Sequence, residues 1–420
     1  MEKLERLLLP LANKLSANKY LAVIRDGFVA IMPIMIVGSF FTLINNVIIG
    51  ENGLTNKLFG IPFTELTKFG GAITPATMSI MAILLTFTTA KALCEHYKEE
   101  TTIVPAIAVV CLFILMPVTF DADLGIEYIN TQYTGAAGMF MSFICAIFTV
   151  EIIRKLSSIH QLVIKMPESV PPSIARSFNK LIPVMLAVIA FGLVRMITNL
   201  SGEPLNDLVF KIIQQPFTNI VSSPIGLAII YFLYMLLWGM GVHSAFIFNP
   251  ILEPIYLASL TANANAIASN QAMTSIMTKP FLDSVAFMGG AGNMLALVVA
   301  IFLVSKRSDQ KEIAKLGFIP ALFNISEPIM FGLPVVMNPI LIIPMILTSM
   351  LGIGIGTIST IVGFMGHTYV LIPWTTPPII SAYLSSGANI GAIITTFIIF
   401  IISVLIYMPF VKLSNKQVNE

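Results

Sequence analysis

The chain has 420 residues, of which 56% are hydrophobic and only 10% are charged, and its mean hydropathy is +0.90. No soluble core is that large, so the composition indicates a polytopic membrane protein in a lipid bilayer and excludes an ordinary water-soluble domain. The formal net charge of +2 is too small to indicate a nucleic-acid partner, and no run of like charges is present.

The first half of the chain predicts a surface helix followed by five membrane spans. Residues 1–25 place leucines on one stripe and basic residues on other faces, which is typical of an amphipathic interfacial helix, here bent at Pro10. The first span begins near Gly27 and lacks a small-residue cleavage site, so no signal peptide is expected. Apolar stretches of about 20 residues, each long enough to cross a bilayer, lie at roughly 27–49, 72–93, 101–120, 135–153 and 181–200.

Lysine and arginine are distributed unequally between the connecting loops. The N-terminal segment and the 154–180 loop carry five each and the 91–100 turn carries two, whereas the 118–134 loop carries none. The positive-inside rule therefore places the N-terminus, the 91–100 turn and the 154–180 loop in the cytoplasm. The lysines near the end of the chain place the C-terminus there as well.

The second half contains a polar connector, further spans and two short elements. The segment 201–222 is too polar for a clean crossing and is interpreted as an interfacial connector between an N-terminal helical domain, residues 1–200, and a C-terminal domain, residues 223–420. Further spans are expected at 225–239, from near His243 to about 260, and at 291–304, 336–358 and 388–410. The predicted fold class is an all-α polytopic membrane protein with about ten transmembrane helices, two re-entrant hairpins at 279–290 and 317–334, and amphipathic interfacial helices.

The stretch 317–334, GFIPALFNISEPIMFGLP, combines an apolar background with Asn324, Glu327 and three prolines. Three prolines cannot lie inside one unbroken helix, because each removes a backbone donor and clashes with the preceding turn. Broken backbone at membrane depth is tolerated only where protein buries it or it lines a wet cavity. A carboxylate there costs roughly 2.5 to 3.5 kcal/mol on insertion scales, so Glu327 is a functional-site hypothesis.

A histidine and two tryptophans extend this hypothesis. His243 follows LLWGMGV at the end of a predicted span, where glycines weaken the helix and allow close approach to a ligand. A hydrogen-bonded core histidine at a kink is the alternative interpretation. Trp238 and Trp374, the only two tryptophans, lie beside irregular polar stretches, where each is either an interfacial anchor or a stacking platform for a sugar ring.

The glycine-rich end of the 279–290 element completes the set of candidates. It suits a hairpin tip packed against a ligand or against the 317–334 stretch, although a tight turn between helices also explains it. Hydrogen-bonding and aromatic groups without a cation cluster fit an uncharged polyhydroxyl ligand, and no metal-ligand spacing or nucleotide motif predicts a metal or a cofactor. The candidate residues are His243, Glu327, Trp238, Trp374, Asn293, Asn324, Gly289 and Gly290.

Three motifs follow one another along the chain: MPESVPPSIARSF at 166–178, LLWGMGVHS at 236–244 and FNISEPIMFGLP at 323–334. Together they resemble enzyme IIC, the membrane subunit of bacterial phosphoenolpyruvate-dependent sugar phosphotransferase systems, in particular its lactose, cellobiose and diacetylchitobiose group. The resemblance implies a homodimer whose N-terminal half supplies the dimer contact and whose C-terminal half holds the sugar and moves across the membrane. It also implies a phosphocysteine-bearing enzyme IIB, itself served by enzyme IIA, that phosphorylates the sugar 6-hydroxyl.

The same resemblance implies roles for individual residues. Glu327 and His243 match the sugar-binding polar residues near the hydroxyl that receives phosphate, and either can act as the base. We expect Glu327 to be mainly an orienting acceptor and His243 to lie nearer the 6-hydroxyl. Ser244 departs from the family pattern, where glycine is common. No cysteine lies in the setting expected of enzyme IIB, so phosphotransferase activity is expected only together with that subunit.

The predicted function is therefore inward transport of a disaccharide of the cellobiose or diacetylchitobiose type across the bacterial cytoplasmic membrane, coupled to its phosphorylation. The main alternative is a proton-coupled secondary sugar transporter in which Glu327 and His243 relay a proton. A third interpretation, an intramembrane enzyme acting on lipid, would need a nucleophile or a metal set, and the sequence offers no recognisable one.

Overall fold

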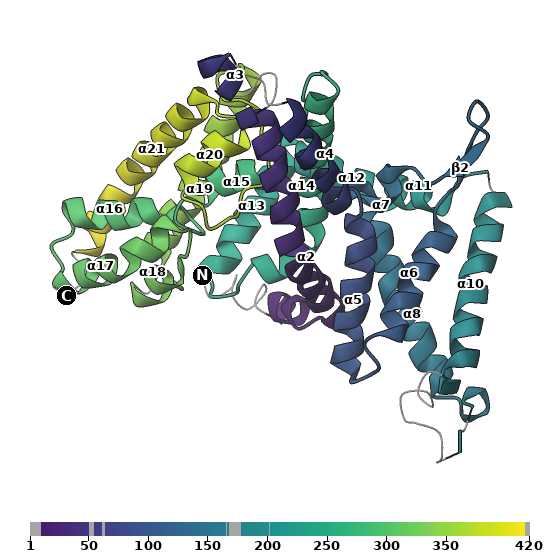
Figure 1. Ribbon diagram of the computed structural model, residues 1–420. Coiled ribbons are helices and arrows are strands. Elements are labelled where there is room, and N and C mark those ends of the chain that lie inside the picture. The colour runs from purple at the N-terminus through teal and green to yellow at the C-terminus, as the bar shows by residue number, and fades with distance from the viewer. Residues whose placement is uncertain are drawn as a thin grey trace. The chain divides into compact units, whose positions relative to one another are not determined.

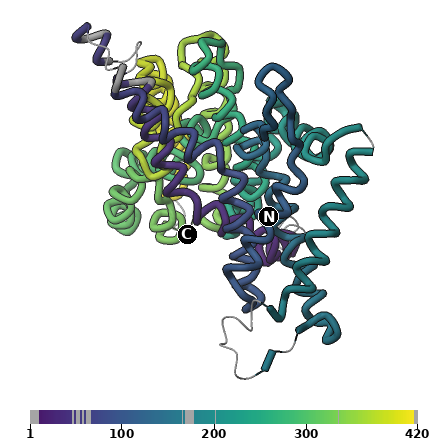
Figure 2. Tube along the Cα trace, turned by 45° about the vertical axis from the view of Figure 1, so that its right-hand side comes forward, coloured from purple at the N-terminus to yellow at the C-terminus, as the bar shows by residue number. Residues whose placement is uncertain are grey.

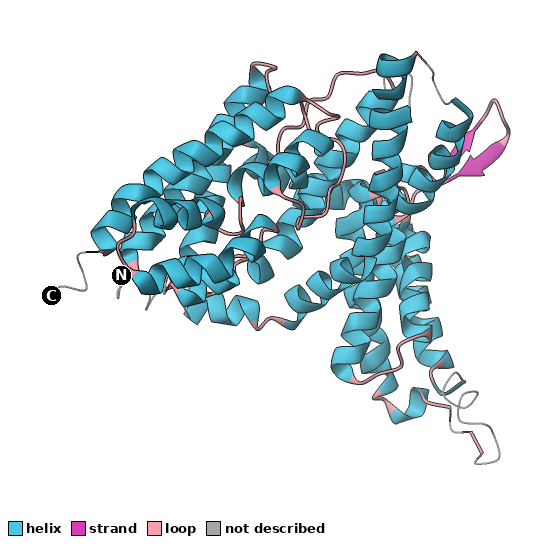
Figure 3. Cartoon of the chain, turned by 60° about the vertical axis from the view of Figure 1, so that its left-hand side comes forward, coloured by secondary structure: helices cyan, strands magenta, loops and turns pink. Residues whose placement is uncertain are grey.

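The computed structural model describes residues 10–49, 54–60, 64–164, 166–167, 178–200, 202–333 and 335–415. Within these residues the regular structure is helical except for one antiparallel hairpin, β1 (Thr119–Asp121) and β2 (Ile126–Tyr128), which Figure 3 shows in magenta. The predicted all-α polytopic fold class is thereby confirmed.

Figure 1 labels most of the helices in chain order. Those up to residue 222 are α2 (Lys19–Leu43), η1 (Ile44–Ile49), α3 (Leu54–Phe59), α4 (Thr64–Met78), α5 (Met81–Tyr97), α6 (Ile103–Leu115), α7 (Thr131–Thr134), η2 (Ala136–Gly138), α8 (Met139–Ser157), η3 (His160–Leu162), α10 (Leu181–Leu200), α11 (Leu205–Val209), η4 (Phe210–Gln214) and α12 (Gln215–Ser222). Those that follow are α13 (Pro224–Gly239), α14 (Ala245–Ala268), α15 (Lys279–Ala286), α16 (Met294–Val304), α17 (Ser308–Leu322), α18 (Glu327–Gly332), α19 (Pro339–Ile361), α20 (Pro378–Ser385) and α21 (Ile390–Ser414).

The chain forms two compact units. One unit comprises Met1–Ser16, Ile36–Thr74 and Asn219–Glu420, and the other comprises Ala17–Met35 and Pro75–Thr218. All candidate site residues belong to the first of these units. The division into a 1–200 domain, a connector and a 223–420 domain stays a prediction.

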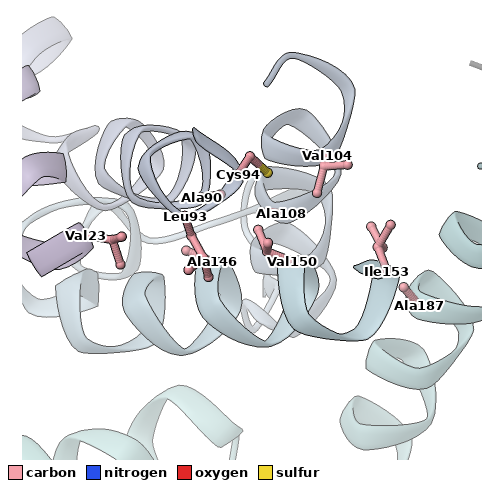
Figure 4. Packing of buried hydrophobic residues seen from close by; sticks show 10 residues of the cluster. All are labelled: Val23, Ala90, Leu93, Cys94, Val104, Ala108, Ala146, Val150, Ile153 and Ala187. Carbon is pink, nitrogen blue, oxygen red and sulfur yellow. The ribbon is translucent and has the colours of Figure 1, made fainter. Parts of the chain in front are cut away.

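Small side chains hold the helices of the second unit close together. Its core joins α5, α6, α8 and α10 around alanines that are fully or almost fully buried, as Figure 4 shows. Small residues let apolar helices approach closely. In a lipid bilayer, where the hydrophobic effect does not drive helices together, this close packing stabilises their association. The three cysteines, Cys94, Cys111 and Cys145, are free and buried in this unit.

In the first unit, α19 and α21 pack together, and α15 packs against α19 and α20. The contact between α19 and α15 is close, since a Cβ added at Gly352 would lie 1.9 Å from the Val285 carbonyl oxygen. Leu43, at the end of α2, packs against Tyr369, Val370 and Ile372. Early and late parts of the chain therefore lie side by side in this unit, as Figure 2 also shows.

Nine of the ten predicted spans each overlap one α-helix, whereas the span at 72–93 falls on both α4 and α5, which are bent by 41° at the break between them. Among the described residues, 6 helices are long and apolar enough to cross a membrane, or up to 8 if each of two bent helix pairs forms one span. Helices α6 and α16 are apolar but shorter. An integral membrane protein is therefore supported, whereas the count of ten crossings stays a prediction.

The start of the first span differs from the prediction. Helix α2 begins at Lys19 rather than near Gly27, because the Asn18 side chain accepts hydrogen bonds from the backbone N–H groups of Tyr20 and Leu21 at 2.9 and 3.3 Å. Residues 10–16 form a separate helical segment, and residues 1–9 of the expected amphipathic helix lie outside the described part of the chain.

Candidate functional site

The 317–334 stretch is broken, as predicted, between α17 and α18. Pro320 lies inside α17, which continues to Leu322, so this proline does not itself end the helix. The helix ends where Asn324 adopts a left-handed backbone with φ of 62° and Ile325 donates to the Pro320 carbonyl at 3.0 Å. Pro328 lies in the first turn of α18, where no helical partner is lost. Pro334 lies outside the described residues.

His243 lies in the tight turn between α13 and α14. Gly241 adopts a φ of 83° there, which a side chain would strain. Ser244, the departure from the family pattern, is fully buried and donates a hydrogen bond to the Tyr234 carbonyl, so its hydroxyl fastens the turn to α13. Met337, after α18, donates its backbone N–H to the Gly239 carbonyl at 2.7 Å. This bond brings the two broken segments together.

The structure places the His243 and Glu327 side chains next to each other. Nε2 of His243 lies 3.9 Å from Oε1 of Glu327, and the two side chains keep 36% and 45% of their surface exposed. The imidazole packs between two rings, with centroid distances of 4.3 Å to Trp238 and 4.2 Å to Phe246. Aromatic packing therefore orients the histidine, while both side chains keep part of their surface exposed.

The two tryptophans differ in accessibility. Trp238 is only 5% exposed and contacts the histidine ring, so it supports His243. Trp374 is 42% exposed and lies in the irregular segment before α20, where its backbone carbonyl accepts a hydrogen bond from Asn324. Trp374 is therefore the more accessible of the two tryptophans.

The tip of the 279–290 element contacts the break in the 317–334 stretch, as expected for paired elements. Gly289 and Gly290 adopt φ values of 84° and 92°, and a Cβ at Gly290 would lie 2.5 Å from the Cβ of Ser326. Gly289 donates its N–H to Oδ1 of Asn324 at 2.9 Å. Glycine is favoured at Gly290 because its backbone is left-handed and an added Cβ would meet both Ser326 and the Asn324 carbonyl oxygen.

Asn293 is fully buried behind this tip. Its Oδ1 accepts from the Met288 backbone at 2.9 Å, and its Nδ2 donates to the Thr348 carbonyl and to the Ser403 hydroxyl at 3.2 Å each. The side-chain amides of Asn293 and Asn324 thus already have protein partners. Direct sugar contact by either amide would require breaking those bonds.

A partly buried ion pair in α15 was not among the predicted site residues. Nζ of Lys279 lies 2.8 Å from both carboxylate oxygens of Asp283, and the side chains are 20% and 13% exposed. The signal for it was the i, i+4 spacing of opposite charges within an otherwise apolar element. No group of three or more His, Cys, Asp or Glu side chains that would hold a metal ion occurs among the described residues.

The basic segment before α17 is partly neutralised by its own acidic residues. Arg307 donates to Asp309 at 2.5 and 3.1 Å, which holds the pKa of that carboxyl below its usual range. Lys315 pairs with Glu312 at 2.7 Å. Within the described part of the chain, Lys306 and Lys311 make no ion pair, so these two lysines supply most of the uncompensated charge of the loop.

The fold and this candidate site define a class of protein, namely helical membrane proteins with polar side chains gathered between broken helices. A model of the family described as "Phosphotransferase system, EIIC" matches residues 25–349, and the chain belongs to this family. The oligo-beta-mannoside-specific EIIC component of Bacillus subtilis is 34% identical over 99% of this chain and 94% of the relative. The cellobiose-specific EIIC component of Geobacillus stearothermophilus is 32% identical over 99% and 94% of the two chains.

A solved structure shows the same fold. It is the crystal structure of the transporter ChbC, the IIC component of the N,N'-diacetylchitobiose-specific phosphotransferase system, with a TM-score of 0.90 and 32% identity over 99% of this chain and 98% of that chain. The lactose-specific EIICB component of Staphylococcus epidermidis is 29% identical, and the match covers 98% of this chain and 70% of that longer protein. The chain is thus an EIIC sugar transporter component of the cellobiose and chitobiose type.

Proposed function

We propose that this EIIC component carries a β-linked disaccharide of the cellobiose or diacetylchitobiose type into the cell and presents its 6-hydroxyl to a phosphocysteine of enzyme IIB. The observation that carries the proposal is the exposed pair of His243 and Glu327 between two broken segments. Their 3.9 Å separation exceeds a direct hydrogen bond, so one hydroxyl oxygen can lie between the two atoms, within hydrogen-bond reach of both and nearer to Nε2. The relatives specific for cellobiose and for N,N'-diacetylchitobiose support the substrate class.

The two side chains have different parts in this mechanism. Glu327 accepts hydrogen bonds from sugar hydroxyls and fixes their orientation, while His243 lies nearer the 6-hydroxyl and takes its proton as the oxygen attacks phosphorus. The phosphoryl group leaves the cysteine thiolate of enzyme IIB and joins the sugar oxygen. The product carries about two negative charges and is repelled by the Glu327 carboxylate, which makes transport one-way without an ion gradient.

The partner subunit docks on the cytoplasmic side in this proposal. The basic loops at 154–180 and 306–315 would meet an acidic surface of enzyme IIB, with both chain termini in the cytoplasm and the N-terminal half forming a homodimer contact. Because Lys306 and Lys311 lack internal ion pairs among the described residues, reversing these two charges should weaken docking more than reversing Lys315, which Glu312 already neutralises. Equal phosphorylation rates in all three variants would refute this docking face.

A panel of disaccharides tests the substrate. Cellobiose, diacetylchitobiose and lactose are titrated into the purified protein in detergent by calorimetry, with sucrose as an unrelated disaccharide. We expect saturable binding of at least one β-linked sugar and none of sucrose. Failure of all β-linked sugars to bind would contradict the proposed substrate class.

The same residue pair would serve a proton-coupled sugar transporter. A histidine beside a carboxylate at 3.9 Å can pass a proton through one bridging water. Vesicles that lack every phosphotransferase component distinguish the two functions. Concentrative uptake there, abolished by a protonophore, would favour proton coupling.

A further inference from the structure

Asn324 connects three segments of the site through its side chain. Its Oδ1 accepts the Gly289 N–H at 2.9 Å, and its Nδ2 donates to the carbonyls of Trp374 and Thr376 at 2.6 and 3.0 Å. The residue is 8% exposed, and both amide hydrogens are used. The amide therefore links the hairpin tip, the break before α18 and the segment that carries Trp374.

The backbone of Asn324 restricts which residues can occupy the position. Its φ of 62° lies in the left-handed region, where glycine, asparagine and aspartate are tolerated and most other side chains are strained. Glycine would permit this backbone but make no side-chain bond, and aspartate would accept from Gly289 but could not donate to two carbonyls. Asparagine alone among the three satisfies the backbone and all three partners.

The linked groups are those that would hold a sugar. Glu327 follows Asn324 by three positions, and Trp374 is the exposed tryptophan whose backbone carbonyl Asn324 binds. We propose that Asn324 is a positioning residue that fixes the Trp374 ring relative to Glu327 and so sets the width of the sugar site. This inference rests on the proposed function, and it assigns Asn324 a role through its neighbours in place of direct contact with substrate. Small displacements of positioning groups have large effects on binding and reactivity.

Asn263 provides a matched control for the test. It is 1% exposed, its Oδ1 accepts the Ser275 N–H at 3.1 Å, and its Nδ2 donates to the Ser275 and Thr368 carbonyls at 2.7 and 2.9 Å. The pattern of one bond accepted and two donated to carbonyls is that of Asn324. The backbone N–H groups of Tyr369 and Val370 both bond to the Ser385 carbonyl, which anchors the chain between Thr368 and Trp374.

The first measurement is sugar affinity in Asn324→Asp, Asn324→Gly and Asn263→Asp, together with the thermal stability of each. Both Asn324 variants should bind the disaccharide at least about tenfold more weakly, whereas Asn263→Asp should lose similar thermal stability and bind within about twofold of the parent protein. Asn324→Gly permits the left-handed backbone and adds no charge, so it replaces Asn324→Asp in the affinity measurement if the aspartate variant does not fold. Unchanged affinity in the Asn324 variants, or an equal loss in Asn263→Asp, would overturn the proposal.

The second measurement needs no sugar. In a Trp238→Phe background, which keeps an aromatic ring against His243, Trp374 is the only tryptophan and its fluorescence reports on its own surroundings. Acrylamide quenching should increase in both Asn324 variants and stay the same in Asn263→Asp. Unchanged quenching in the Asn324 variants would contradict the positioning role. If the parent protein binds no disaccharide, the proposed function fails, while quenching still decides whether Asn324 holds Trp374.

Discussion

Nε2 of His243 and Oε1 of Glu327 lie 3.9 Å apart, although they belong to different broken segments of the chain. Two features bring them together: the left-handed turn at Gly241 and the backbone bond from Met337 to Gly239. The distance leaves room for one hydroxyl oxygen between the two side chains. In the proposed mechanism this is the sugar hydroxyl that receives the phosphoryl group.

Replacing Glu327 by glutamine should weaken sugar binding. The substitution keeps the shape but removes a charged acceptor, and hydrogen bonds to charged groups are worth about 1.5 to 3 kcal/mol. Affinity measured by calorimetry on the purified protein should fall by at least about tenfold. Full affinity in Glu327→Gln would show that the carboxylate does not orient the sugar.

His243→Gln should affect phosphoryl transfer more than binding. A positioned general base contributes about a hundredfold or more to the rate, whereas glutamine can still donate one hydrogen bond to a hydroxyl. With phosphorylated enzyme IIB in excess, the rate of sugar phosphate formation should fall about a hundredfold, with a smaller loss of affinity than in Glu327→Gln. A change in affinity alone would assign the base to another group.

Breaking the ion pair in α15 should destabilise the fold. Asp283→Asn leaves the Lys279 ammonium, which is 20% exposed, without its hydrogen-bonded partner, and removing one member of a buried ion pair costs on the order of 3 kcal/mol, an upper bound for this partly buried pair. The thermal unfolding temperature in detergent should drop clearly. The double variant Lys279→Met/Asp283→Leu, which removes both charges, should recover most of the lost stability. If it does not, the two side chains contribute to the fold through contacts other than their mutual ion pair.

Two glycines of α19 provide an internal test of the close packing on α15. Gly352→Ala should lower the free energy of unfolding by about 1 to 3 kcal/mol, because the new Cβ would meet the Val285 carbonyl oxygen at 1.9 Å. Gly354→Ala, in the same helix with nothing within 4 Å, should instead stabilise the protein by up to about 1 kcal/mol through helix propensity. Equal effects in thermal unfolding would contradict the packing.

Glu100 should make stability depend on pH. Burial alone would raise the pKa of this carboxyl, but the backbone N–H groups of Thr102, Ile103 and Val104 at the start of α6 bond to it and hold its pKa below the ordinary value. A folded pKa below the unfolded one gives stabilisation that is present above the unfolded value and is lost as pH falls through the folded value. Glu100→Gln should therefore be less stable than the parent at pH 7, with a difference that shrinks as the solution is acidified towards pH 3. A difference that does not change with pH would show that the charge is not involved.

Hydropathy predicted where the helices lie along the sequence. A helix in lipid needs a long apolar segment, and this requirement does not depend on which other helices it contacts. The lengths were less predictable, since α6 and α16 end after short apolar runs that lie inside longer apolar windows. The start of α2 at Lys19 depended on one capping side chain, Asn18, which a hydropathy window does not weigh. The small hairpin of β1 and β2 was not predicted from the sequence.

The sequence predicted which residues would gather at the candidate site, whereas their roles in sugar binding stay a prediction. His243 and Glu327 lie side by side, as the two motifs indicated. Asn293 and Asn324 were candidates for their polarity at membrane depth, and that polarity is used to fasten backbone segments. The bonded carbonyl groups are distant in sequence. Only the structure therefore shows that these two amides hold backbone segments together and are not free to bind a ligand. Lys279 and Asp283 were missed because their charges neutralise each other within an apolar element.

Uptake into membrane vesicles tests the central claim most directly. Vesicles containing the protein are loaded with phosphorylated enzyme IIB of the cellobiose or diacetylchitobiose type and exposed to labelled disaccharide outside, with and without a protonophore. The account predicts that sugar appears inside as its 6-phosphate, in an amount set by the phosphorylated partner and unchanged by the protonophore. Accumulation of unmodified sugar in vesicles without the partner, lost when the protonophore is added, would contradict it.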